Sequence, residues 1–167
     1  AAGATTYISD SIETVAENMR EVRPTVMTSV PRLFERIKMR VENRMAQENA
    51  LRQAIFRWAL RIGEKVIDGD RGGATRLQHA LADRLVFAKI RERTGGRLRF
   101  FVSGGAALSK DVARFFQKVG LTILEGYGLT ETSPVLCVNR EGREEIGTVG
   151  PPLPNVEIRI ADDGEIM

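Results

Sequence analysis

The sequence predicts an α/β fold in which helices flank part of a parallel or mixed sheet and one helical stretch is inserted. Two short apolar runs, at 98–103 and 121–124, each precede a glycine-containing segment and have the composition of buried strands. The amphipathic segment between them has helical spacing, so strand, helix and strand alternate as they do in parallel sheets. A long run of helical periodicity at 35–97 supplies the insertion.

The composition is that of a globular chain with one core. Of its 167 residues, 43% are hydrophobic and 28% are charged, which suits one domain of ordinary size. No run of 18 apolar residues occurs and the first ten residues lack a basic and then apolar pattern, so we expect neither a membrane span nor a signal peptide. A single cysteine, Cys137, and a single histidine, His79, exclude an internal disulfide and a histidine-rich metal cluster. The cysteine count is compatible with a reducing compartment, and we expect a cytoplasmic protein.

The first thirty residues predict a helix, a strand and the start of a second helix. Asp10 and Glu13 have the spacing of a capping box, and apolar residues recur at helical intervals to about Glu21. The run 25–29 is rich in β-forming residues. Pro31 is well placed at the first position of the following helix.

The helical stretch that follows is interrupted twice. Apolar residues spaced three or four apart over 34–66 predict either one long helix or two helices that meet near Asn49. The segment 68–73 is rich in glycine and aspartate and predicts a turn. His79 is expected to pack or to lie at the surface, since it has no catalytic partner nearby in sequence. Trp58 is expected in the core or at an interface. A further helix is marked by apolar residues at Leu77, Leu81, Leu85 and Ala88.

The second half of the chain carries the expected strands of the sheet. Ser109 is placed to cap the helix between the runs 98–103 and 121–124, and each run is followed by a glycine-rich loop. Ligands of parallel sheets bind at the carboxyl ends of strands, which is where both loops lie. Cys137 is expected in a further buried strand. Near the end, prolines precede a predicted strand at 156–160, and Asp162-Asp163-Gly164 predicts a hairpin turn.

The net charge of +3 hides an asymmetry along the chain. Residues 35–99 carry 16 basic and 8 acidic side chains, whereas residues 100–167 carry 6 basic and 10 acidic ones. The basic stretch suggests an anionic partner such as a phospholipid surface, nucleic acid or a nucleotide. The alternative is a solvated helix face on which basic and acidic side chains are interspersed.

The segments 103–108 and 125–134 carry the residues suited to nucleotide chemistry. Their glycines allow a ligand to approach the backbone closely. Tyr127 offers a flat face to a heteroaromatic base, Thr130 a hydroxyl to a phosphate oxygen, and Glu131 a carboxylate to Mg²⁺. Alone, each segment is also explained as a tight turn with Tyr127 in ordinary packing. Together they favour a nucleotide site.

The motif YGLTETSP at 127–134 resembles the adenine-binding signature of the AMP-forming acyl-CoA synthetases, in the superfamily of adenylate-forming enzymes. SGGAAL at 103–108 is similar to the adenine loop of that family. The segment RPTVMTSVPRLFERI at 23–37 resembles one found in the long-chain fatty-acid members of the family. The segment IGTVGPPLPNVEIRI at 146–160 resembles the one that follows the signature. The resemblance implies a fragment of the large N-terminal domain, with 35–97 as a basic helical region.

The resemblance also implies a residue-by-residue assignment of the site. The segment 98–134 becomes the adenine-binding core and 145–167 the start of the following β subdomain. Gly105 and Gly128 would in addition border the acyl channel. Catalysis would rest on Thr130, at the phosphate, and on Glu131, which would also hold the metal. The residues expected to contact the nucleotide are Gly105, Ala106, Ala107, Glu125, Gly126, Tyr127, Gly128, Leu129 and Thr130.

The function implied is that of a long-chain fatty-acid–CoA ligase, with ATP, Mg²⁺ and coenzyme A, that forms an acyl-adenylate and transfers the acyl group to coenzyme A. No phosphate loop with its lysine occurs in the chain, and the family's ribose-binding aspartate and C-terminal catalytic lysine are not found. We therefore expect a fragment of a longer protein that is inactive alone. Two alternatives stay open: another adenylate-forming enzyme with a different carboxylate substrate, and a basic helical module that binds anionic lipid or nucleic acid. The lack of a nucleic-acid motif makes nucleic acid the less expected partner, whereas peripheral contact with an anionic membrane is retained.

Overall fold

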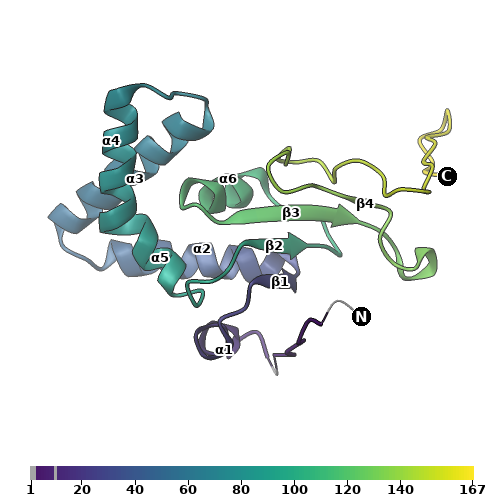
Figure 1. The fold of residues 1–167 in the computed structure, drawn as a ribbon, viewed down its shortest axis with the longest axis horizontal. Helices are drawn as coiled ribbons and strands as arrows, with labels where there is room; N and C mark the ends of the chain where they lie inside the picture. The colour runs from purple at the N-terminus through teal and green to yellow at the C-terminus, as the bar shows by residue number, and fades with distance from the viewer. Residues whose placement is uncertain (1–2, 10) are drawn as a thin grey trace.

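A four-stranded mixed sheet with strand order β1-β2-β3-β4 forms the centre of the computed structural model, which describes residues 3–9 and 11–167 (Figure 1). The first three strands are parallel and β4 is antiparallel to β3. This confirms the predicted mixed α/β fold. The elements are α1 (Val15–Val22), β1 (Val26–Ser29), α2 (Pro31–Ala46), α3 (Ala50–Ile67), α4 (Gly73–Ala82), the π-helical turn η1 (Asp83–Phe87), α5 (Ala88–Glu92), β2 (Phe100–Ser103), α6 (Lys110–Lys118), β3 (Thr122–Tyr127), the 3₁₀ turn η2 (Thr130–Thr132) and β4 (Cys137–Val138).

The parallel register brings the carboxyl ends of three strands to one edge of the sheet. Ser29 of β1 pairs with Ser103 of β2, which pairs in turn with Glu125 of β3. Register partners in a sheet point to the same face, since side chains alternate along each strand. The edge that follows these residues is where the two glycine-containing loops begin.

Helices α2 and α6 cover one face of the sheet. The strand order 1-2-3 advances in one direction, and right-handed crossovers then place the connecting helices on the same side. Phe34 of α2, Phe101 of β2 and Phe116 of α6 form an edge-to-face cluster with ring centroids 5.2–5.8 Å apart. All three rings are buried, and each such aromatic pair adds about 0.5–1.5 kcal/mol beyond its burial.

The opposite face of the sheet carries exposed residues at β1. Val26 and Thr28 are exposed, and Phe100 and Val102 of β2 beside them are half-buried. The register pairs these residues across the two strands. The core of the described residues therefore lies on the face that packs against α2 and α6.

The segment 34–66, for which the sequence predicts one long helix or two, is divided between two helices, α2 and α3. Asn49 marks the start of the second helix, because its side-chain oxygen accepts a hydrogen bond from the Arg52 N–H at 3.0 Å and caps α3. Pro31 occupies the first turn of α2, as predicted. Helix α3 packs closely on α6 at Gly63, where a Cβ would lie 2.9 Å from the Lys118 carbonyl oxygen.

Two predicted helix caps differ in the structure. Helix α1 begins at Val15 with Thr14 as its N-cap residue and with no side-chain capping bond. Glu13 instead forms an ion pair with Arg36 at 3.1 Å, and Asp10 lies outside the described residues. Ser109 stands at the N-cap of α6, but its hydroxyl makes no capping hydrogen bond.

Two predictions for the strands were wrong in their boundaries. Strand β3 continues through Tyr127, so Glu125 and Gly126 belong to the strand and not to the loop after it, because β4 pairs with this extension. The segment 156–160 forms no continuous strand and has only an isolated bridge between Ile160 and Ile166. The predicted hairpin turn at 162–164 does connect these two residues.

The remaining packing predictions were confirmed. Cys137 is buried in β4. Trp58 packs against the core, and His79 stacks obliquely on Phe87 with ring centroids 5.9 Å apart. Among the described residues, no helix is both long and apolar enough to cross a membrane.

Candidate functional site

Two loops lie side by side at the carboxyl edge of the sheet, one after β2 and one after β3. The Gly104 N–H donates to the Ser29 carbonyl oxygen at 3.2 Å, which holds the first loop against β1. A Cβ at Gly104 would lie 3.9 Å from the Gly126 carbonyl oxygen, so the first loop also passes close to β3. The Ser103 hydroxyl at this edge is buried and has no hydrogen-bond partner among the described residues.

The first loop presents small residues to solvent. Gly105, Ala106 and Ala107 are all exposed, whereas Leu108 is buried and anchors the loop. Gly105 has φ of +81°, a conformation that strains other residues. The glycine at 105 is thus required by the backbone, and the loop offers an open surface without large side chains.

Glu125 connects this loop to a third segment. Its side chain is 8% exposed, and Oε2 accepts a hydrogen bond from the Leu108 N–H at 3.4 Å. Oε1 accepts one from the Gly147 N–H at 3.2 Å. The residue predicted to line a nucleotide pocket therefore fixes two backbone segments with one carboxylate.

Asn139 organises the segment that contains Gly147, a role that no sequence motif indicates. It is 4% exposed, its amide donates to the Thr148 carbonyl oxygen at 2.6 Å, and its side-chain oxygen accepts from the Glu145 N–H at 3.2 Å. The Asn139 N–H donates to the Glu125 carbonyl oxygen at 2.9 Å. An asparagine after an apolar run is too common a pattern to have indicated these contacts.

Tyr127 and Gly128 lead from β3 into the second loop. Both are half-buried, and the Tyr127 carbonyl oxygen accepts from the Leu136 N–H at 2.8 Å. A Cβ at Gly128 would overlap the backbone carbonyl of Pro134. Close approach of two chain segments therefore requires glycine at 128, independently of any ligand.

The second loop turns tightly and exposes its apex. The Leu129 N–H donates to the Thr132 hydroxyl at 3.0 Å, and that hydroxyl donates back to the Leu129 carbonyl oxygen at 2.9 Å. Ser133 completes the turn in a left-handed conformation with φ of +61°. Leu129, Thr130 and Glu131 are exposed at the apex, so the Thr130 hydroxyl and the Glu131 carboxylate are available to a ligand.

The donor set at this edge fits Mg²⁺ only together with a phosphate ligand. Within residues 3–9 and 11–167, no group of three or more His, Cys, Asp or Glu side chains could hold a metal alone. Mg²⁺ is commonly bound by one or two carboxylates plus substrate phosphates. Glu131 is exposed and forms no ion pair among the described residues, so its carboxylate is free for that arrangement.

The structure thus brings the predicted residues to one edge in three groups. The first loop supplies Gly105, Ala106 and Ala107, and the end of β3 supplies Glu125, Gly126 and Tyr127. The loop after β3 supplies Gly128, Leu129, Thr130 and Glu131. Lys110, which was not predicted, also lies near this edge, because its side chain occupies the space of a Cβ at Gly147.

The chain has a mixed α/β sheet with two glycine-containing loops at its carboxyl edge, and comparison with known proteins gives its family. The profile of the AMP-binding enzyme family matches residues 1–166. The chain therefore belongs to the AMP-binding enzyme family. This confirms the resemblance found in the sequence.

The curated relatives are named as ligases or synthetases that act on fatty acids or form acyl-CoA. The chain is 40% identical over 167 residues to the long-chain-fatty-acid–CoA ligases FadD15 of Mycobacterium bovis and Mycobacterium tuberculosis. It is 35% identical over 161 residues to the peroxisomal long chain acyl-CoA synthetase 6 of Arabidopsis thaliana. The match to the FadD15 proteins covers 98% of this chain and 28% of theirs. The match to the plant protein covers 96% of this chain and 22% of that protein. The chain thus spans between 22% and 28% of the length of these relatives.

Solved structures show the same fold. ATP-bound MatB from Rhodopseudomonas palustris matches with a TM-score of 0.52 and 22% identity, over 94% of this chain and 22% of that one. The anthranilate CoA ligase AuaEII in complex with anthranoyl-AMP matches with a TM-score of 0.51 and 18% identity, over 93% and 22%. At these identities the likeness concerns the fold.

Proposed function

We propose that the complete protein containing this chain is an AMP-forming long-chain fatty-acid–CoA ligase that uses ATP and coenzyme A. One observation carries the proposal: Tyr127 at the end of β3, and Thr130 and Glu131 in the loop after it, lie at the carboxyl edge, as does the exposed loop at 105–107. The 40% identity to long-chain-fatty-acid–CoA ligases across 98% of the chain supports the choice of substrate.

The proposed reaction has two steps and needs no nucleophile from the protein. A fatty-acid carboxylate oxygen attacks the α-phosphorus of ATP, a new O–P bond forms, and pyrophosphate leaves. The sulfur of coenzyme A, after loss of its proton, then attacks the acyl carbonyl carbon and AMP leaves. Catalysis therefore depends on positioning and on stabilising negative charge.

The residues at the carboxyl edge would share the binding of the nucleotide. Gly105, Ala106 and Ala107 expose backbone without large side chains, so that a base can lie against the loop, and the Tyr127 ring would stack on it. Glu125 would act through its hydrogen bonds to Leu108 and Gly147, by holding the walls of the pocket. Gly126 and Leu129 would complete the lining.

The apex of the second loop would act on the phosphates. The Thr130 hydroxyl would donate to a phosphate oxygen, and the Glu131 carboxylate would hold Mg²⁺. When bound, Mg²⁺ neutralises phosphate charge and withdraws electrons from the phosphoryl oxygens. Gly105 is also proposed to border the acyl channel, and Gly128 shares that assignment although the Pro134 contact already explains its glycine.

The test is the adenylation rate of the complete protein with Glu131→Gln. Glutamine keeps the size of the side chain but removes the charge, so the rate of pyrophosphate release should fall roughly 100-fold or more. Glu157→Gln, at another exposed acidic residue, is the matched control and should retain the wild-type rate. A Glu131→Gln protein with full activity would refute the assignment of the metal ligand.

The substrate class has a separate test. The complete protein should convert long-chain fatty acids to acyl-CoA in preference to malonate, benzoate or anthranilate, and the isolated 167-residue chain should convert none. Adenylation of one of the smaller carboxylates alone would favour another adenylate-forming enzyme. Acyl-CoA formation by the isolated chain would show that these residues suffice.

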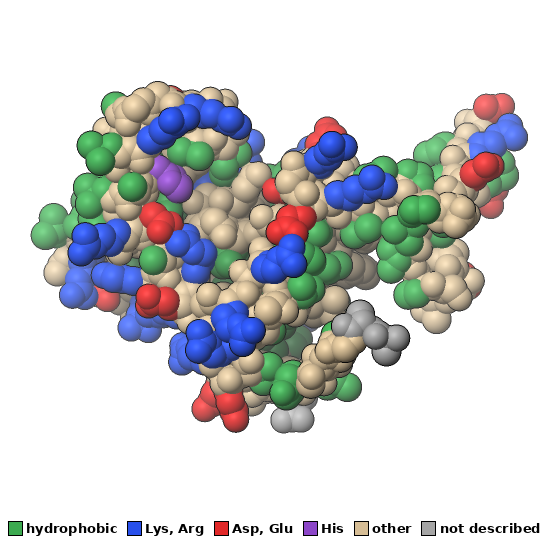
Figure 2. All heavy atoms as spheres, viewed as in Figure 1, with side chains coloured by type: hydrophobic (Ala, Val, Ile, Leu, Met, Phe, Trp, Pro, Cys, Tyr) green, Lys and Arg blue, Asp and Glu red, His purple; other side chains and the backbone are tan. Residues whose placement is uncertain are grey.

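We also propose that the complete protein is a cytoplasmic enzyme that contacts anionic membranes peripherally. The predicted apolar stripe on α4 and η1 faces outward: Leu77 is 75% exposed, Leu81 50% and Leu85 41%. Arg76 and Arg84 lie next to it in sequence, and Figure 2 shows many cations over the helical end of the molecule, with apolar side chains between them. Apolar residues framed by cations suit the interface of an anionic bilayer.

A further inference from the structure

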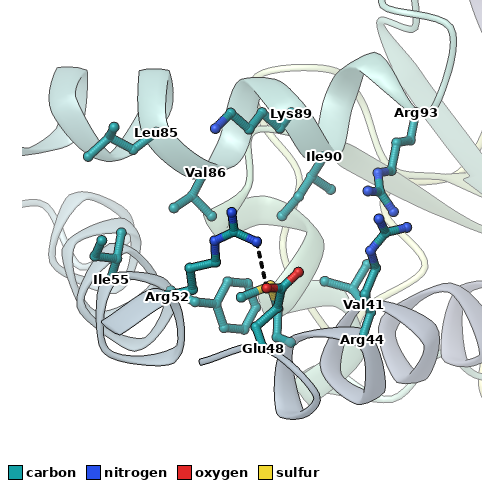
Figure 3. A pocket seen from close by; sticks show the side chains of 12 residues that line it. Val41, Arg44, Glu48, Arg52, Ile55, Leu85, Val86, Lys89, Ile90 and Arg93 are labelled. Atoms are coloured by element: carbon teal, nitrogen blue, oxygen red, sulfur yellow. Dashed lines mark hydrogen bonds and ion pairs between the residues drawn. The ribbon is translucent and has the colours of Figure 1, made fainter. Parts of the chain in front are cut away.

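A groove at the helical end of the molecule lies between α2, α3 and the η1–α5 segment (Figure 3). Its volume is about 420 Å³, within the range of small-molecule sites. In Figure 1 the helices α3, α4 and α5 gather at the end of the sheet opposite to the tip of β3. The α2–α5 groove, as we name it, is therefore separate from the carboxyl-edge site.

The floor of the α2–α5 groove is apolar and comes from all three helical segments. Helix α2 contributes Val41 and Met45, α3 contributes Ile55 and Phe56, and the η1–α5 segment contributes Val86 and Ile90. Phe56 is 7% exposed, and the others are half-buried. An alkyl chain that displaces water from such a floor lowers the free energy, because apolar surface is buried on both sides.

The rim of the α2–α5 groove is cationic. Four cations line it, and only Arg52 is neutralised, by an ion pair with Glu48 at 2.6 Å. Arg44, Lys89 and Arg93 have no carboxylate within 4 Å among the described residues. The rim thus carries three uncompensated positive charges over an apolar floor.

Arg44 of α2 and Arg93, which follows α5, face one another across the groove (Figure 3). Partial burial and then the nearby charges of Arg44 and Arg20 lower the pKa of Arg93. Like charges held together in this way repel, and an anion between them would relieve the repulsion. The charge distribution points to a negatively charged ligand group at this end of the groove.

We propose that the α2–α5 groove binds an amphipathic anion with a single alkyl chain, whose head group lies between Arg44, Lys89 and Arg93 and whose chain lies along the apolar floor. A fatty-acid anion and a lysophosphatidate share this chemistry. A free phosphate or a nucleic-acid backbone would meet the cations but would leave the apolar floor exposed to water. The α2–α5 groove is separate from the carboxyl-edge site, so its ligand does not depend on the proposed ligase activity.

The test is photolabelling of the complete protein with a diazirine analogue of palmitate, without ATP and coenzyme A so that no ligation occurs. Peptide mapping should place label on 41–56 and 85–93. Excess palmitate or palmitoyl lysophosphatidate should compete, and methyl palmitate, which lacks the charge, should compete poorly. Stronger competition by one of the two anions identifies the head group.

A pair of matched variants separates binding from folding. Arg44→Gln with Arg93→Gln removes two cations that repel each other, so the fold should be retained, and labelling of 41–56 and 85–93 should require about tenfold more probe or higher. Arg57→Gln with Arg61→Gln removes two exposed cations of α3 outside the groove and should label as wild type.

Three results would overturn the proposal: label confined to other peptides, equal loss in both double variants, or equal competition by methyl palmitate. Each of these outcomes is compatible with full ligase activity, so failure of the groove would be distinguishable from failure of the proposed function. Label on other peptides in addition to 41–56 and 85–93 would report the substrate site and would leave the groove proposal supported.

Discussion

The Glu125 carboxylate accepts a hydrogen bond from the Gly147 N–H at 3.2 Å, although 22 residues separate the two in sequence. Its second oxygen accepts from the Leu108 N–H, so one buried side chain joins three segments of the chain. Removal of an acceptor from a buried network leaves donors unpaired, which costs about 1–3 kcal/mol for each donor. The shape of the carboxyl edge therefore depends on Glu125.

Glu125→Gln should loosen the walls of the carboxyl-edge site. The amide has one acceptor oxygen, so one of the two N–H groups would face the NH₂ end of the side chain. Hydrogen–deuterium exchange of the complete protein should quicken at 104–109 or 145–150, and the KM for ATP should rise more than kcat falls. Unchanged exchange in both segments, with Glu157→Gln as the control, would contradict the role of Glu125.

Gly128→Ala should disrupt the second loop. A Cβ there overlaps the Pro134 backbone, which cannot move as a flexible side chain can, so a loss of about 1–3 kcal/mol of stability is expected. The control is Gly73→Ala: Gly73 is in α4 and has no atom within 4 Å of its Cβ position. That substitution should stabilise by up to about 1 kcal/mol, since alanine favours helix. Equal melting temperatures for the two variants would refute the close contact.

Asp70 should make the turn between α3 and α4 sensitive to acid. The Gly72 N–H and then the Thr75 hydroxyl donate to its carboxylate at 2.9 and 2.8 Å, and these bonds lower the pKa of Asp70 below 3.8. Since the folded pKa lies below the unfolded one, the stabilisation is present above about pH 4 and is lost as pH falls through the folded pKa. Amide exchange at 72–76, corrected for intrinsic rates, should quicken in that window. Asp70→Asn should abolish this pH dependence, and an unaltered profile would exclude the carboxylate as its cause.

Leu77→Ser with Leu81→Ser should weaken sedimentation of the complete protein with vesicles that contain anionic lipid. The two leucines are exposed, so the change should cost little stability while it removes the apolar part of the contact. Raised salt should weaken the wild-type interaction further, because each cation near the surface contributes about 1 kcal/mol that salt screens. Sedimentation that does not change with salt or with the charge of the lipid would contradict the proposed contact with anionic membranes.

Much of the local structure follows from neighbouring residues. The apolar runs 98–103 and 121–124 were predicted to be strands followed by glycine-containing loops, and each does lie at a strand that precedes such a loop, because apolar runs of strand length followed by glycine are local signals. The motif at 127–134 identified the family for the same reason, since its residues are consecutive. The end of the second strand could not be predicted in this way. Pairing with β4 extends β3 to Tyr127, and the residues of β3 do not themselves indicate that partner.

Three features were decided only by tertiary structure. The stripe Leu77, Leu81 and Leu85 has the spacing of a buried face, yet packing of η1 through Phe87 leaves it exposed. The position of Glu125 in a glycine-rich motif indicated a ligand contact, whereas its observed partners are backbone groups at Leu108 and Gly147. The cations Arg44 and Arg93 are far apart in sequence and face the same groove only because α2 and the η1–α5 segment both pack against α3. Periodicity and motifs report contacts along the chain, while these three depend on which distant segments fold together.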